Sequence, residues 1–233
     1  MNQELSARAG LKDVVPTLVG YIGVGLAFGI VAKAANLSVL VVFIMSLLVY
    51  AGAGQFLIVS MLTAGAPVVT IAISVLLINA RMSLMSMTVA PYLKKESLLK
   101  YIGLGSLLTD ETFALSMNKL NYTDRQLNGA WLNTANIVAY LVWALSTVVG
   151  AVLGSAISDP KVLGLDFAVV AMFIGLLYLQ MIADHSKPLI MHLEVAGFVM
   201  VSIFVLMRFM PGNTAILVGT ILGCLFGMAV EKK

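Results

Sequence analysis

Charged side chains are scarce in this sequence of 233 residues, in which Asp, Glu, Lys and Arg make up 11% and hydrophobic residues 61%. No charged residue occurs between Lys33 and Arg81. Because a single helix needs only about 20 apolar residues to cross about 30 Å of hydrocarbon, this run must cross the membrane, turn and re-enter. The scarcity of charge excludes an ordinary soluble domain and predicts a polytopic helical membrane protein.

Cysteine and the common catalytic motifs are also missing or rare. Cys224 is the only cysteine, which excludes an intramolecular disulfide and a thiolate metal cluster. The sequence contains no Gly-x-Ser-x-Gly, Walker A or His-Glu-x-x-His pattern, and the spacing of His185 and His192 fits no zinc site. The formal charge of +3 is spread over loops and chain ends, so it predicts no nucleic-acid partner. We therefore expect a protein that is not an enzyme and that uses no metal or cofactor.

The apolar runs between the clusters of charge predict the fold class, an all-α polytopic membrane protein with about 7–8 transmembrane helices. Helices are expected because backbone groups find no hydrogen-bond partner in lipid. Residues 14–32 form 19 uncharged positions, longer than the roughly 7–15 of a signal peptide, so we expect an uncleaved first span. Residues 1–233 are expected to form a single transmembrane domain. The predicted segments are 14–34, 38–62, 66–93, 98–118, 128–157, 165–183, 190–210 and 213–230.

The topology of these segments stays open at the level of sequence. Apart from Arg81, the lysines and arginines divide seven against six between the two sides of an eight-span arrangement, so charge bias does not decide the orientation. Residues 51–54, Ala-Gly-Ala-Gly, are a candidate for a broken or re-entrant helix. The Gly-xxx-Gly spacing and apolar run in 150–182 resemble those in 25–57, which makes an internal repeat a further alternative.

Arg81 lies well inside a predicted membrane segment, where a charge without a partner or water costs at least about 2.5 kcal/mol. We expect residues 66–93 and 98–118 to form an antiparallel hairpin. In such a hairpin Arg81, Asp110 and Glu111 lie at one depth, about 20 Å from the turn at a rise of about 1.5 Å per residue. Since adjacent helix positions point about 100° apart, one carboxylate is expected to pair with Arg81 and the other to face a cavity. A purely structural ion pair is the alternative.

A run of small residues precedes Gln55 in the middle of a segment otherwise rich in Val, Leu and Ile. Gly52 and Gly54 lower helix stability and permit close backbone approach. In transporters such a stretch exposes backbone groups that bind the charged ends of a substrate, whereas tight helix packing is the alternative interpretation. The amides of Gln55 and Asn79 need partners if they are buried. With the buried charges, these residues suit a small zwitterion with an apolar body, such as an amphipathic amino acid.

Six short blocks of sequence carry a family resemblance. They are GLAFG at 25–29, MS at 45–46, YAGAGQF at 50–56, LINAR at 77–81, LTDETFA at 108–114 and LDFA at 165–168. In this order they resemble the AzlC family, the large subunits of bacterial branched-chain amino acid exporters. The resemblance covers roughly residues 14–180, and the combination of blocks is specific. Ala80 and Met82 stand beside Arg81 where many relatives have Leu and His, and Gly54 stands where Ser or Ala is common; these departures bear on substrate choice more than on fold.

The resemblance implies secondary-active export of valine, leucine, isoleucine or methionine across the bacterial cytoplasmic (inner) membrane, in the lipid bilayer, with a small AzlD-type membrane subunit as partner. A non-transporting scaffold, a passive channel for small amphipathic solutes, and an intramembrane enzyme remain as alternatives. Asp110 and Glu111 would be the only candidate groups of such an enzyme, and in an exporter they are the candidate carriers of a coupling proton. The predicted substrate site comprises Gly52, Gly54, Gln55, Asn79, Arg81, Asp110 and Glu111.

Overall fold

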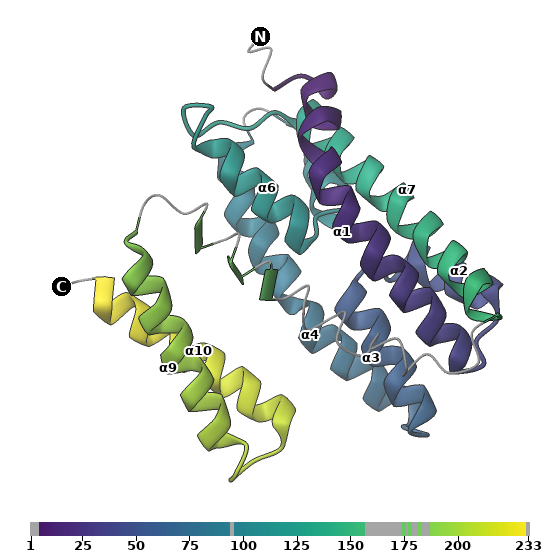
Figure 1. The fold of residues 1–233 in the computed structure, drawn as a ribbon. Coiled ribbons are helices and arrows are strands. Elements are labelled where there is room, and N and C mark those ends of the chain that lie inside the picture. Colours follow the sequence, from purple (N-terminus) through teal and green to yellow (C-terminus); the bar gives the residue numbers. More distant parts are fainter. Residues whose placement is uncertain are drawn as a thin grey trace. The chain divides into compact units, whose positions relative to one another are not determined.

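The computed structural model describes residues 5–93, 96–156, 174–175, 177–178, 181–182 and 187–231. Within these ranges the regular elements are helices, apart from one isolated bridge between Leu93 and Leu127. The chain divides into two compact units, Met1–Leu179 and Gln180–Lys233, which are described separately (Figure 1). The helices of the first unit are α1 (Ala7–Ala34), α2 (Val39–Leu48), α3 (Gly52–Thr63), α4 (Val68–Val89), η2 (Ala90–Tyr92), α5 (Leu98–Ser106), α6 (Asp110–Leu120) and α7 (Gly129–Gly154).

The long helices α1 and α7 lie side by side in the first unit (Figure 1). Gly29 and Gly150 allow this approach, because a Cβ at either position would overlap the backbone of the opposite helix. Lipid supplies no hydrophobic drive for helix association, so small residues that bring backbones into contact stabilise such a pair by van der Waals packing. Phe28 of α1 and Trp143 of α7 stack beside these glycines, with ring centroids 6.5 Å apart. The pair therefore forms a closely packed support for the shorter helices.

The predicted segment 38–62 is interrupted, as the run of small residues indicated. Helix α2 ends at Leu48 and α3 begins at Gly52, with Ala51 in an extended conformation between them. The two helices have 10 and 12 residues, so each alone is shorter than the roughly 20 residues that cross a bilayer. The broken helix predicted here is therefore confirmed.

The predicted segment 98–118 is also interrupted, and the expectation of one continuous helix is wrong. Helix α5 ends at Ser106 and α6 begins at Asp110. The physical reason is a capping box at Thr109, whose side chain accepts from the Thr112 amide while the Thr112 hydroxyl accepts from the Thr109 amide, at 3.0 Å. This reciprocal pair satisfies backbone groups that a new helix would otherwise leave without partners.

The second unit contains the helices α9 (Leu189–Leu206) and α10 (Gly212–Glu231). They pack through Gly219 and Gly223, where a Cβ would overlap Ile203 and Val199, respectively. Their aromatic side chains Phe198 and Phe226 stack with centroids 4.2 Å apart, and Lys187 forms an ion pair with Glu231.

Within the described ranges, five helices are long and apolar enough to cross a membrane, and α2 and α3 are shorter apolar helices. The predicted segment 165–183 and the family block at 165–168 fall largely or wholly outside the described residues, as do His185 and most of the second half of the proposed repeat. The count of seven or eight spans and the internal repeat therefore stay predictions. The five spans are Ala7–Ala34, Val68–Tyr92, Gly129–Gly154, Leu189–Leu206 and Thr214–Glu231.

We predict that Gly29→Ala lowers the melting temperature of the protein in detergent by several degrees, because the added Cβ collides with the Thr147 carbonyl and separates α1 from α7. Gly23→Ala is the matched control on the same helix, since a Cβ there meets nothing within 4 Å. Thermal unfolding followed by size-exclusion chromatography measures both variants. Equal melting temperatures for the two would contradict the close packing of α1 on α7.

Candidate functional site

The two helix breaks meet at one small cavity inside the first unit. The cavity has a volume of about 20 Å³, enough for about one water molecule. Its wall combines both breaks with side chains from α1, α4 and α7, so residues far apart in the sequence enclose it. The lining residues are Tyr21, Tyr50, Ala51, Gly52, Ala53, Met82, Thr109, Asp110, Glu111 and Trp143.

Arg81 on α4 forms an ion pair with Asp110 at the start of α6. The distance from Arg81 Nη2 to Asp110 Oδ2 is 2.8 Å, and the Asp110 side chain is 11% exposed against 32% for Arg81. The equal depth inferred from the sequence thus brings these two residues together, although α5 and α6 are separate helices. The acidic residues of the first turn also complement the partial positive charge of the α6 N-terminus.

Glu111 points to a different partner, as the 100° step between adjacent helix positions predicts. Its Oε2 accepts a hydrogen bond of 2.9 Å from the hydroxyl of Tyr21 on α1. The same hydroxyl contacts the Thr109 hydroxyl, so Tyr21 ties the second break to the central helix pair. One carboxylate therefore pairs with Arg81 while the other lines the cavity beside an aromatic wall.

The first break places Tyr50 in an unusual backbone conformation, with φ of +42°. Non-glycine residues rarely adopt positive φ, and such positions cluster at functional sites. The Tyr50 ring packs edge-on against Tyr140, with centroids 4.8 Å apart, while its buried hydroxyl makes no hydrogen bond to the described part of the chain. Gly52, the first residue of α3, lies against the Trp143 ring, from which a Cβ would be 3.1 Å away.

Gln55 is fully buried and holds Trp143 in place rather than lining the cavity itself. Trp143 Nε1 donates to Gln55 Oε1 at 2.8 Å, and Gln55 Nε2 donates to Ser46 Oγ at 3.0 Å. The Ser46 and Thr147 hydroxyls are 2.8 Å apart and continue the network to α7. This chain of polar groups joins α2, α3 and α7 behind the cavity.

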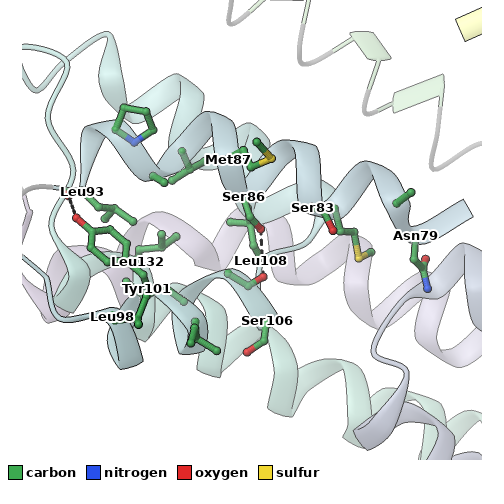
Figure 2. Close-up of a pocket in the computed structure, with 18 of the residues that line it drawn as sticks. Asn79, Ser83, Ser86, Met87, Leu93, Leu98, Tyr101, Ser106, Leu108 and Leu132 are labelled. Carbon is green, nitrogen blue, oxygen red and sulfur yellow. Dashed lines mark hydrogen bonds between the residues drawn. The ribbon is translucent and has the colours of Figure 1, made fainter. Parts of the chain in front are cut away.

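Gly54 and Asn79 contact each other, because a Cβ at position 54 would lie 3.1 Å from Asn79 Nδ2. Asn79 lines a second, wider groove of about 980 Å³ along α4 and α5. Figure 2 shows this groove, with Asn79 toward one end, Leu93 toward the other, and Ser83 and Ser86 between them. Met82 lines both the groove and the small cavity, so this one flexible side chain stands between them.

The structure therefore groups the predicted site residues in three ways. Gly52, Asp110 and Glu111 line the cavity; Arg81 and Gln55 each hold one of its wall residues; and Gly54 and Asn79 pack together nearby. Sequence reasoning missed the contributions of Tyr21, Thr109 and Trp143.

Among the described residues no three His, Cys, Asp or Glu side chains gather closely enough to hold a metal ion. The roles of the predicted residues in substrate binding and proton coupling remain predictions.

Residues 16–157 match the family described as "AzlC protein", a range that contains every residue lining the cavity. The chain belongs to the AzlC family. It is 32% identical over 226 residues to "Inner membrane protein YgaZ" of Escherichia coli (strain K12). The aligned region covers 93% of this chain and 87% of that relative. AzlC-family membership and this relative place the chain among multi-pass proteins of the bacterial inner membrane.

Other relatives of this AzlC-family chain are more distant or less described. An "Uncharacterized membrane protein" of Helicobacter pylori (strain ATCC 700392 / 26695) is 32% identical over 71% of this chain and 73% of its own length. The "Branched-chain amino acid transport protein AzlC" of Bacillus subtilis (strain 168) is 23% identical over 72% of this chain and 65% of its own length. No solved structure matches the chain.

A double-mutant cycle tests whether Arg81 and Asp110 stabilise each other. We predict that Arg81→Gln and Asp110→Asn each lower stability, and that the double variant is less destabilised than their sum by about 1 kcal/mol, because each single change leaves a charge without its partner. The pair Lys100–Glu96 is the matched control, and its coupling should be no more than about 0.5 kcal/mol, because the Lys100 side chain is 69% exposed. Equal couplings in the two cycles would show that the inner pair has no special importance for stability.

Proposed function

We propose that the protein is a secondary-active exporter of branched-chain amino acids across the cytoplasmic membrane, working with a small AzlD-type subunit. Valine, leucine and isoleucine are the proposed substrates, with methionine as a further one. The observation that carries this proposal is the cavity itself: two interrupted helices, a buried ion pair and a second buried carboxylate enclose one space in a membrane protein. Intramembrane charges beside broken helices are typical of transport pathways.

The chemistry of the cavity wall suits an amino acid with an apolar side chain. A substrate of this class carries a carboxylate, an ammonium group and a hydrocarbon body. Glu111 offers a negative charge, the start of α3 offers backbone N–H groups, and Met82 and Trp143 offer apolar surface. The printed name of the Bacillus subtilis relative, a branched-chain amino acid transport protein, supports the same class of substrate.

The size of the cavity implies a change of conformation during transport. A volume of about 20 Å³ holds about one water molecule, far less than a leucine side chain requires. The breaks at Ala51 and Thr109 are the natural hinge positions, because rotations there move α3 or α6 without disturbing the helix pair α1–α7. Displacement of Met82 would join the cavity to the wide groove along α4, and we propose this as a route for substrate.

Energy coupling is proposed to use the same carboxylates. Asp110 and Glu111 are consecutive residues at the start of α6, and among the described residues Asp110 pairs with Arg81 whereas Glu111 has no ion pair. Binding or release of a proton at either residue would change the net charge of the cavity and therefore its affinity for a zwitterion.

The direct test is efflux from cells that express the protein together with its small subunit. After cells are fed leucine-containing dipeptides, we predict that the wild-type pair lowers intracellular leucine, and that Arg81→Gln or Asp110→Asn reduces the initial efflux rate by at least about tenfold, since one uncompensated buried charge is enough to distort the site. Lys100→Gln is the matched control, because the Lys100 side chain is 69% exposed on α5 and its ion pair with Glu96 lies outside the cavity wall. Membrane amounts of each variant are measured by immunoblotting.

A scaffold role gives a different pattern. If the ion pair only ties α4 to α6, the double change Arg81→Met with Asp110→Leu keeps full activity of the assembly, since apolar replacement of both partners is often tolerated. Full leucine efflux in that variant would contradict the proposed role of the ion pair in transport, and unchanged leucine levels with the wild-type pair would contradict the proposed exporter.

A further inference from the structure

The cavity has two chemically opposite halves, and we propose that they orient the substrate. In this assignment Tyr50 and the start of α3 bind the α-carboxylate, while Glu111, positioned by Tyr21, binds the α-ammonium. The assignment rests on the proposed function, because it takes an α-amino acid as the substrate. It adds the direction in which the substrate lies and the residue that selects for a carboxylate.

The half that suits an anion lies at the N-terminus of α3. Ala51 is the N-cap residue and has no side chain that could accept from the first backbone N–H groups. The first intrahelical hydrogen bond at this end runs from the Gln55 amide to the Ala51 carbonyl at 2.8 Å. The N–H groups of Gly52, Ala53 and Gly54 therefore begin the helix without a side-chain cap, at the end that carries partial positive charge.

Tyr50 supplies a second and independent indication of a ligand in this half. The residue is 7% exposed and lines the cavity, and its hydroxyl, which lies near the Tyr21 hydroxyl, makes no hydrogen bond of good geometry to the described part of the chain. A buried hydroxyl without a partner is uncommon, because burial removes the water to which it would otherwise bond. The ring is fixed edge-on against Tyr140, so the hydroxyl stays where a ligand carboxylate could accept from it.

The opposite half lies at the start of α6 and carries negative charge. This helix differs from α3 in that the Thr109 capping box already satisfies its first backbone groups. Arg81 compensates Asp110, whereas no ion pair with Glu111 occurs among the described residues. The Glu111 carboxylate accepts hydrogen bonds, among them one of 2.9 Å from the Tyr21 hydroxyl, and no cation is paired with it in the described part of the chain, so it is the group best placed to receive an ammonium.

This arrangement predicts how the protein discriminates between analogues of leucine. Leucinamide keeps the ammonium and the side chain but lacks the carboxylate, so it loses the contacts at Tyr50. The compound 4-methylpentanoate keeps the carboxylate and the side chain but lacks the ammonium, so it loses the contact at Glu111. Each analogue consequently reports on one half of the cavity.

The experiment measures competition of both analogues with radiolabelled leucine in proteoliposomes that contain the protein and its small subunit. For Tyr50→Phe we expect leucine affinity to fall about tenfold with leucinamide affinity unchanged, because one hydrogen bond to a charged group is lost. For Glu111→Gln we expect the reciprocal pattern, in which the affinities for leucine and leucinamide fall and the affinity for 4-methylpentanoate does not. Tyr140→Phe is the matched control, since its hydroxyl bonds the Leu47 carbonyl and does not line the cavity.

Three results would overturn the orientation alone. The first is a ratio of leucine to leucinamide affinity in Tyr50→Phe that equals the wild-type ratio. The second is an equal loss of affinity for every ligand in Tyr50→Phe and Tyr140→Phe, and the third is a pattern reversed between Tyr50→Phe and Glu111→Gln. A wild-type complex that neither binds nor transports leucine would overturn the proposed function, and the orientation with it. Because Glu111→Gln reports on the other half, the assignment stays testable if Tyr50→Phe fails to fold.

Discussion

The ion pair between Arg81 and Asp110 fixes the start of α6 against α4, and the geometry of the cavity depends on that contact. Glu111 follows Asp110 directly, so the position of one carboxylate sets the direction of the other. Tyr21 of α1 holds the Glu111 side chain in that direction, because its hydroxyl donates a hydrogen bond to the Glu111 carboxylate. A charged contact inside a membrane segment is expensive to form and expensive to break, which makes it suited to a site that must keep one geometry until a substrate arrives.

The first unit combines a closely packed part with an interrupted part. Glycines on α1 and α7 bring these helices into backbone contact, and closely packed interfaces resist small deformations. The short helices α3 and α6, which begin after Ala51 and Thr109, instead contribute their N-terminal ends to the cavity wall. Lipid cannot satisfy backbone groups at such breaks, so they occur where protein or a cavity does. The proposed transport cycle, in which the short helices move against the pair α1–α7, uses this division.

Much of this arrangement could be predicted from local sequence. The charge-free run predicted membrane helices, and the Ala-Gly-Ala-Gly run predicted the first break. The depth of Arg81 predicted a contact with one of the two carboxylates, Asp110 or Glu111, without deciding which. The second break was missed, although Thr109 and Thr112 with two intervening acidic residues form a recognisable helix start. Tyr21 and Trp143 were missed for another reason: their partners Glu111 and Gln55 are 90 and 88 residues away, and local patterns in one sequence carry no information on such contacts.

The central claim is that the amino acid binds in the cavity between the two breaks, and thiol protection tests it most directly. Cys224 is the only cysteine, so Cys224→Ser gives a background in which Ala53→Cys, at the cavity wall, is the only thiol. A methanethiosulfonate reagent would then label the protein in proteoliposomes with its small subunit. We predict that saturating leucine slows the labelling of Ala53→Cys several-fold and that lysine does not, because bound leucine occupies the cavity. Labelling that is insensitive to leucine in a complex that still transports it would contradict the claim.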